Sequence, residues 1–175
     1  MIPALFESNE EDTAILAWTT TPWTLPSNCA LAIGANITYV KIKTFNPYTY
    51  TPVSVVLAKD LVSKYFKAEA EGASFEDYLP GDKLIPWVKS AEFNGSDLVG
   101  LRYEQLMPYI TNENLEKNAF RVIPGDFVTT EDGTGIVHTA PAFGADDFRV
   151  GKKYNIGILT LVDREGKFVE GLSEF

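Results

Sequence analysis

Residues 14–33 read AILAWTTTPWTLPSNCALAI, two short apolar runs on either side of a segment rich in threonine, proline and tryptophan. The first run, within Asp12–Trp18, and the second, Ala30–Ile33, each predict a buried strand. Pro22 and Pro26 bias the residues before them towards extended geometry, which predicts a non-helical turn between the strands. This turn gathers hydroxyl groups and indole rings at the end of a strand.

A second informative segment, residues 133–147, reads GTGIVHTAPAFGADD. It contains His138, the only histidine of the chain, and Asp147 nine positions later. Residues 136–138 predict a strand, and Asp146–Tyr154 predicts a helix that buries Phe148 and Val150. Asp147 lies in the first turn of this helix, where a carboxylate favours the helix dipole. Taken singly, the threonines, the histidine and the aspartate are each explained by strand, core and cap roles.

The rest of the chain adds short strands and few helices. Alternating or continuous apolar residues predict further strands at 38–45, 53–57, 120–123 and 127–130, and a last hairpin from 158–162 and 167–169. Helical spacing is confined to Lys59–Phe66 and the helix after Asp146. This pattern predicts an α+β, β-rich fold, a closed or nearly closed β-barrel with peripheral helices.

Composition narrows the function classes. The 175 residues fit a single domain, and 45% of them are hydrophobic, enough for a sizeable core. One cysteine and one histidine argue against a disulfide and against a metal site, and no membrane span or cofactor motif is predicted. Gly133–His138 lacks the third glycine of a dinucleotide fingerprint, and Gly95–Gly100 lacks the lysine of a phosphate loop. A reducing, cytoplasmic location is the simplest expectation.

The net charge of −9 argues against a free-standing nucleic-acid binder, because phosphate neutralisation supplies most non-specific affinity. A nucleic-acid end delivered by other domains is still compatible with this charge. The basic group best placed to meet phosphate is Arg149, Lys152 and Lys153, just after Asp147.

Jointly, the two segments resemble the editing domain, a connective insertion, of class I isoleucyl-tRNA synthetases. Residues 19–28 resemble the first editing motif of that family and residues 133–147 resemble the second. Trp23 and His138 are typical of the isoleucyl branch, since the valyl and leucyl branches have other residues there. Leu101–Glu104 resembles a further family segment, with Gln105 where proline is usual. The synthetic signatures are absent, so residues 1–175 resemble a single editing domain excised from a larger synthetase.

The resemblance implies hydrolysis of valyl-tRNA(Ile), with valyl-adenylate as a further candidate substrate. In this family an editing site acts as a second sieve, because a hydrophobic pocket cannot strongly reject a substrate lacking one methylene. Isoleucyl-tRNA synthetase is itself the standard example of that argument. The implied partners are the 3′ end of mischarged tRNA(Ile) and the remainder of the parent synthetase, with no membrane and no cofactor.

The resemblance also implies residue roles. Asp147 resembles the carboxylate that binds the substrate α-ammonium, and His138 resembles a gate that admits valine and excludes isoleucine. The remaining predicted residues surround the ester, the terminal ribose and the adenine: Thr20 and Thr21 with Thr19 and Thr24, supported by Asn28, and walled or stacked by Trp18 and Trp23. No side chain resembles a nucleophile, so water is expected to attack.

Three alternatives stay open at this point. A valyl- or leucyl-type editing domain would remove threonine or norvaline. A non-hydrolytic module would bind an amino acid or a tRNA end in the same pocket, and turnover alone separates it from a hydrolase. A β-rich interaction domain would bind no ligand there.

Overall fold

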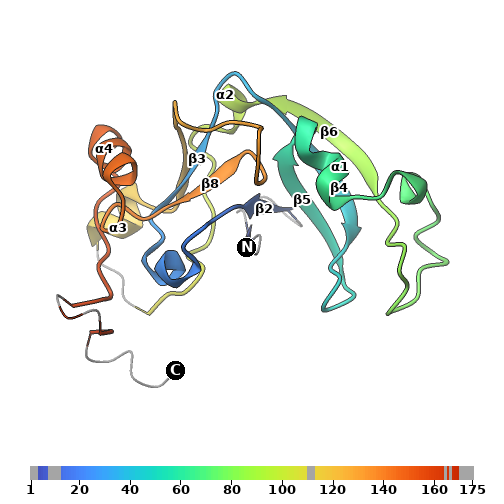
Figure 1. Cartoon of the computed structure of the whole chain (residues 1–175), viewed down its shortest axis with the longest axis horizontal. Coiled ribbons are helices and arrows are strands. Elements are labelled where there is room, and N and C mark those ends of the chain that lie inside the picture. The colour runs from blue at the N-terminus through green and yellow to red at the C-terminus, as the bar shows by residue number, and fades with distance from the viewer. Residues whose placement is uncertain (1–3, 8–12, 110–112, 164, 166, 170–175) are drawn as a thin grey trace.

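The structure is a computed structural model that describes residues 4–7, 13–109, 113–163, 165 and 167–169. Its strands form two sheets, which flank the end of strand β2 (Figure 1). The larger sheet contains, in the order β1-β2-β5-β4-β6, Ala4–Glu7 (β1), Thr13–Ala17 (β2), Pro52–Ala58 (β5), Thr38–Phe45 (β4) and Val88–Asn94 (β6). The smaller contains, in the order β7-β3-β8, Arg121–Pro124 (β7), Ala30–Ile33 (β3) and Ile136–Thr139 (β8).

Both sheets are mixed. In the larger sheet β2 pairs parallel with β5, whereas β1–β2, β5–β4 and β4–β6 are antiparallel. A bulge between Lys41 and Ile42 shifts the register of β4 against β6. In the smaller sheet β3 pairs parallel with β7 and antiparallel with β8, which places Leu31 opposite His138. The two sequence segments singled out above thus lie on neighbouring strands.

Trp18 joins the two sheets. Its N–H donates to Ile136 O (2.8 Å) and its C=O accepts from His138 N (3.0 Å), directly after β2 ends. The β-rich α+β class is therefore confirmed. The described strands form two open sheets connected at this point, with no closed barrel among them, because β2 pairs with β5 along its length and with β8 only at Trp18.

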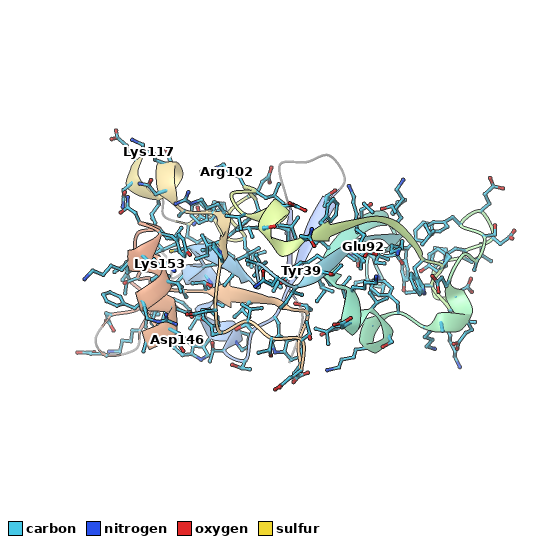
Figure 2. All side chains as sticks on the ribbon, turned by 90° about the horizontal axis from the view of Figure 1, so that it is seen from above. Tyr39, Glu92, Arg102, Lys117, Asp146 and Lys153 are labelled. Atoms are coloured by element: carbon cyan, nitrogen blue, oxygen red, sulfur yellow. The ribbon has the colours of Figure 1, made fainter. Side chains whose placement is uncertain are left out.

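The core lies on both faces of the larger sheet, because successive side chains of a strand alternate between faces. Ile15, Ala17 and Tyr39 belong to the main core shared with the smaller sheet. Val40 and Ile42 belong to a second cluster on the opposite face. Tyr39 is labelled at the centre of Figure 2, and its hydroxyl donates to Gly135 O (2.6 Å) just before β8.

Helices are short and peripheral. They are the 3₁₀ helices Pro22–Ser27 (η1), Lys59–Leu61 (η2) and Ala68–Ala70 (η3), and the α-helices Val62–Tyr65 (α1), Gly95–Leu98 (α2), Glu113–Asn118 (α3) and Ala145–Lys153 (α4). No helix among the described residues is long and apolar enough to cross a membrane.

Most of the predicted strands are confirmed, and four local predictions are wrong. Residues 158–162 and 167–169 form no strands and share only an isolated bridge between Val162 and Phe168. Residues 127–130 form a turn and not a strand. Phe148 is exposed on α4, whereas Val150 faces the core. The turn after β2 is helical, because Pro22 supplies the backbone angle of a first helical position and lacks the N–H that would be unpaired there.

Candidate active site

The threonine segment folds back on itself through its own hydroxyl groups. Thr19 Oγ1 accepts from Thr21 N (3.1 Å), which tightens the chain between β2 and η1. Thr24 Oγ1 donates to Thr21 O (2.8 Å), and Thr21 Oγ1 lies 3.3 Å from Thr24 Oγ1. These bonds connect Thr19, Thr21 and Thr24 to one another at the start of η1.

His138 joins the two sequence segments. Its Nε2 lies 2.9 Å from Thr24 Oγ1 and its Nδ1 lies 2.9 Å from Asn28 Nδ2. The side chain is only 5% exposed, and this burial lowers the pKa of His138 to about 4. The imidazole is therefore neutral near pH 7, with both ring nitrogens hydrogen-bonded inside the protein. Nothing about this geometry offers a free nitrogen to act as a general base.

Asp147 is brought to the same region by the turn between β8 and α4. Cys29 N donates to Thr139 O (3.0 Å), which ties the end of η1 to the end of β8. Within the turn that follows, the Phe143 ring meets the Trp23 ring edge to face, 5.2 Å between centroids. Asp147 Oδ2 accepts from Ala140 N (2.8 Å), so the carboxylate is held against the backbone of this turn.

The charges around the Asp147 carboxylate favour the binding of a cation. Burial raises the pKa of Asp147, an effect opposed by the Ala140 N–H and reinforced by the charge of Asp146. Arg149, two residues away, forms its ion pairs with Asp126 (3.0 Å) and Asp146 (3.3 Å) instead. Within the described residues, Asp147 has no cationic partner and its Oδ1 accepts no hydrogen bond.

The predicted site residues fall into an exposed set and a buried set. Thr20, Thr21 and Trp23 are exposed, the last by 58% of its surface. Thr19, Thr24, Asn28 and His138 are buried beneath them. Asp147 is intermediate between the two sets.

The two tryptophans differ in their surroundings. Trp18 lies against the backbone of Gly133, where an added Cβ would stand 2.7 Å from Trp18 Cγ. Its ring is therefore packed against the turn that leads into β8. Trp23 offers an open ring face at the surface beside Phe143.

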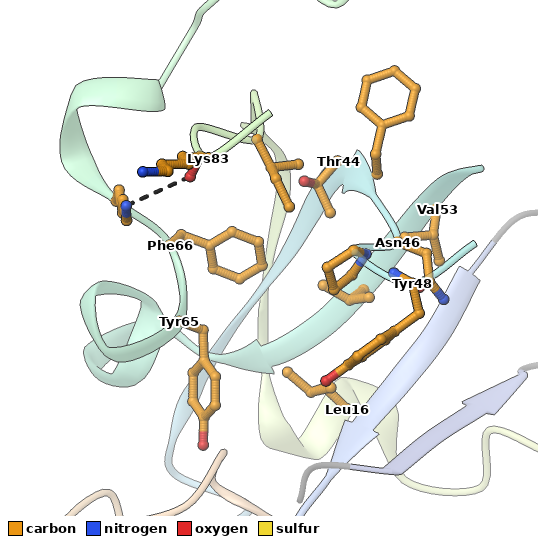
Figure 3. Close-up of a pocket in the computed structure, with 13 residues that line it drawn as sticks. Leu16, Thr44, Asn46, Tyr48, Val53, Tyr65, Phe66 and Lys83 are labelled. Atoms are coloured by element: carbon orange, nitrogen blue, oxygen red, sulfur yellow. Dashed lines mark hydrogen bonds between the residues drawn. The ribbon is translucent and has the colours of Figure 1, made fainter. Parts of the chain in front are cut away.

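Two cavities in the described part of the molecule are lined by other residues. One, of about 320 Å³, covers the outer face of the larger sheet and is lined by residues that include Leu16, Tyr48 and Phe66 (Figure 3). The other, of about 330 Å³, lies between the Gly34–Ile37 turn and α4. Neither of these two cavities is lined by a predicted site residue.

The basic group predicted to meet phosphate is divided. The Arg149 charge is balanced by the two aspartates already described. Lys152 and Lys153 are exposed at the end of α4, and Lys153 Nζ lies 5.1 Å from the centroid of the Tyr154 ring. Asp146 and Lys153 are both labelled on this helix in Figure 2.

Sequence patterns did not single out two residues that support the site. Tyr103 is buried, and its hydroxyl donates to Asn28 Oδ1 (2.6 Å). Phe143 supplies the ring that holds Trp23. The available signal was Tyr103's place in a segment that resembles the family. In the described part of the chain, no group of three or more His, Cys, Asp or Glu side chains is arranged to hold a metal ion.

Known structures share this fold. The cytosolic leucyl-tRNA synthetase editing domain of P. falciparum superposes with a TM-score of 0.57 at 18% identity, covering 83% of this chain and 49% of that one. The corresponding P. knowlesi domain gives a TM-score of 0.55 at 14% identity, covering 83% of this chain and 55% of that one. The fold is therefore that of a synthetase editing domain.

Sequence relatives name the family. Isoleucine–tRNA ligase of Cytophaga hutchinsonii is 56% identical over 94% of this chain, and that of Clostridium tetani is 49% identical over 92%. The chain belongs to the isoleucine–tRNA ligase family. It spans 16% and 13% of the length of these two relatives. No family model matches the chain.

Proposed function

We propose that this chain is the editing domain of an isoleucine–tRNA ligase and that it hydrolyses valyl-tRNA(Ile). Water attacks the ester carbonyl, the bond to the terminal ribose oxygen breaks, and valine and tRNA with a free ribose hydroxyl are released. Valyl-adenylate is the second candidate substrate. Residues 1–175 act as one domain whose tRNA is delivered by the rest of the enzyme, which agrees with the net charge of −9.

The observation that carries this proposal is the partly buried carboxylate of Asp147, which has no cationic partner among the described residues and is held by a turn whose Phe143 ring contacts Trp23 of the threonine segment. Burying a carboxylate without a cation costs free energy, and an α-ammonium group placed at Oδ1 would recover that cost. An amino acid attached to a tRNA end presents such an ammonium close to its ester. The charge-assisted hydrogen bond would hold the ester over η1.

The other residues divide between contact with the substrate and support. Thr20 and Thr21, exposed at the start of η1, position the ester and the attacking water, since oriented hydroxyls lower the entropic part of the barrier. Trp23 offers its open face to the terminal adenine, because base–aromatic stacking needs one accessible ring face. Thr19, Thr24 and Asn28 hold this surface from below.

His138 acts in this scheme as a rigid wall. Both of its nitrogens are engaged, so the ring cannot turn to accommodate a longer side chain. A difference of one methylene is worth roughly 1–3 kcal/mol in such a pocket, which suits a gate between valine and isoleucine. Trp18, fixed against Gly133, contributes to the base of the same surface.

The test is deacylation of valyl-tRNA(Ile) and isoleucyl-tRNA(Ile) by the 175-residue chain and by Asp147→Asn. We expect release of valine and not of isoleucine. The Asp147→Asn substitution keeps the side-chain shape and removes the charge. We expect it to slow valine release roughly 10- to 100-fold, the worth of one charge-assisted hydrogen bond.

Asp146→Asn is the matched control. Asp146 is the neighbouring aspartate, exposed and paired with Arg149, so its charge lies at a similar place without facing the site. Equal losses in the two variants would contradict a specific anchor at Asp147. Hydrolysis of isoleucyl-tRNA(Ile) at the same rate as valyl-tRNA(Ile) would contradict the proposed sieve.

A further inference from the structure

Tyr103 lies outside both motifs and yet reaches their centre. Its backbone N–H donates to Phe120 O (3.0 Å), and its ring packs edge to face with Phe120 (6.3 Å between centroids). The side chain is only 3% exposed. Burial raises the pKa of the phenol well above its ordinary range, so the hydroxyl keeps its proton and donates it to Asn28 Oδ1 (2.6 Å).

The amide of Asn28 is oriented by two partners, one at each end of the amide. Its Nδ2 lies 2.9 Å from Ala30 O, and a carbonyl oxygen only accepts, so this atom must be the NH₂ group. The same Nδ2 faces His138 Nδ1 at 2.9 Å. The Tyr103 hydroxyl on the other side satisfies Oδ1. The orientation of an asparagine amide is normally assigned by such partners, and here they agree.

The orientation of Asn28 sets the tautomer of His138. Because Nδ1 faces a donor, it must accept, and the proton of the neutral ring must be on Nε2. Nε2–H then donates to Thr24 Oγ1 (2.9 Å), and the Thr24 hydroxyl donates to Thr21 O (2.8 Å). Each of the four hydrogen bonds that lead from Tyr103 to Thr21 therefore joins one donor to one acceptor.

We propose that Tyr103 is a positioning residue of the editing site: through Asn28 its hydroxyl holds His138 in the Nε2–H tautomer, and His138 in turn holds Thr24 and the exposed Thr21 at the start of η1. The catalytic part of this inference rests on the proposed function. The tautomer part does not, because it concerns only the resting protein. Buried, fully matched chains of this kind also strengthen one another.

Loss of the Tyr103 hydroxyl would change the hydrogen bonds that lead from Asn28 to Thr21. Asn28 Oδ1 would be buried without the donor it has among the described residues. If the Asn28 amide turns over and gives up its bond to Ala30 O, Oδ1 faces His138 Nδ1, and the other tautomer of His138 supplies a replacement donor through Nδ1–H. In that tautomer His138 Nε2 can only accept a hydrogen bond. The Thr24 hydroxyl has a single proton, so it could donate to His138 Nε2 or to Thr21 O but not to both. The hydrogen bonds at the start of η1 would then alternate between two arrangements.

The experiment is a long-range ¹H–¹⁵N correlation spectrum of the ¹⁵N-labelled chain, wild type and Tyr103→Phe. His138 is the only histidine, so its two ring nitrogens are assigned without ambiguity. In the wild type we expect one protonated-type nitrogen, Nε2, and one unprotonated-type nitrogen, Nδ1. In Tyr103→Phe we expect the two shifts to move towards each other as the tautomers mix. Deacylation of valyl-tRNA(Ile) should fall roughly 10-fold in kcat with KM nearly unchanged.

Tyr39→Phe is the matched control. Tyr39 is also fully buried, and its hydroxyl donates to Gly135 O and accepts from Gly34 N. It takes no part in the hydrogen bonds that lead from Tyr103 to Thr21. We expect its His138 nitrogen shifts to match those of the wild type. If Tyr39→Phe mixes the tautomers as strongly as Tyr103→Phe, general loosening is the cause and the inference is wrong.

The outcomes separate this inference from the proposed function. A wild-type spectrum with the proton on Nδ1 overturns the inference even if Tyr103→Phe does not fold. Mixed tautomers with unchanged kcat overturn the positioning role. Absence of deacylation in the wild type, with the expected spectra, counts against the proposed function and supports the tautomer assignment.

Discussion

Acidification should destabilise this protein mainly through His138. The pKa of His138 in the folded protein is about 4, against an ordinary value of 6.5. As the pH falls below 6.5 the unfolded chain takes up a proton that the folded chain does not take up until about pH 4. The free energy of unfolding therefore decreases with falling pH across this window. Integrated from about pH 7 to about pH 4.5, the difference is about 2 kcal/mol.

The geometry explains why the folded protein resists this proton. A second ring proton would be placed on Nδ1, opposite the amide hydrogens of Asn28 Nδ2. Two donors would then face each other 2.9 Å apart in a buried position. The imidazolium form is thus penalised both by burial and by its partner.

The assay is urea unfolding of the wild type and of His138→Gln at pH 7 and pH 4.5. Glutamine is neutral at both values, so the contribution of His138 is absent from that variant. Exposed carboxylates with lowered pKa values, such as Asp126 and Asp132, also weaken the fold in acid, and they affect both proteins alike. We expect the wild type to lose about 2 kcal/mol more than His138→Gln.

Equal losses in the two proteins would refute this reasoning. An independent check needs no variant, because the His138 ring resonances of the wild type should show no titration between pH 7 and pH 5. A midpoint near the ordinary value of 6.5 would mean that the ring is accessible to water, contrary to its 5% exposure.

Three further outcomes follow from single positions. Gly135→Ala should lower the free energy of unfolding by about 3 kcal/mol or more, because φ is +73° and the new Cβ would meet Ala58 Cβ; thermal unfolding measures this. Gly144→Ala should fold normally and deacylate roughly 10-fold more slowly, since its Cβ would stand 3.2 Å from Asp147 Cγ and displace that carboxylate; an unchanged rate would count against the anchor. Cys29, whose pKa burial raises to about 11, should resist iodoacetamide at pH 8 in the native protein and react once urea unfolds it.

Local pattern was sufficient for the elements whose side chains alternate or form compact apolar runs. Strands Ala30–Ile33 and Thr38–Phe45 lie where the sequence predicts them, to the residue. The strand at residues 88–94 was not predicted, because its side chains are mostly exposed and carry no apolar alternation. It exists because β4 offers it a backbone edge, which no local pattern records.

The residues of the candidate site also fall into those that the local sequence indicates and those that it does not. The two motifs, and with them His138 and Asp147, were visible in the sequence because they are contiguous and resemble a family. Asn28 and Tyr103 are 75 positions apart, so no periodicity in the sequence reveals their hydrogen bond. Phe148 and Val150 are both predicted to be buried, and only Val150 is, because residues two positions apart on a helix lie on different faces.

Composition and short-range pattern by themselves determined a β-rich domain and a turn rich in threonine, and the resemblance to a family supplied the candidate site residues. Tertiary structure alone decided that the strands make two open sheets joined at Trp18, that both nitrogens of His138 are engaged, and that Asp147 has no cationic partner in the described chain. The physical reason is the distance along the sequence over which each effect acts. Propensity and periodicity act over a few residues, whereas hydrogen-bond partners and charge pairs are set by which distant strands the chain topology places side by side.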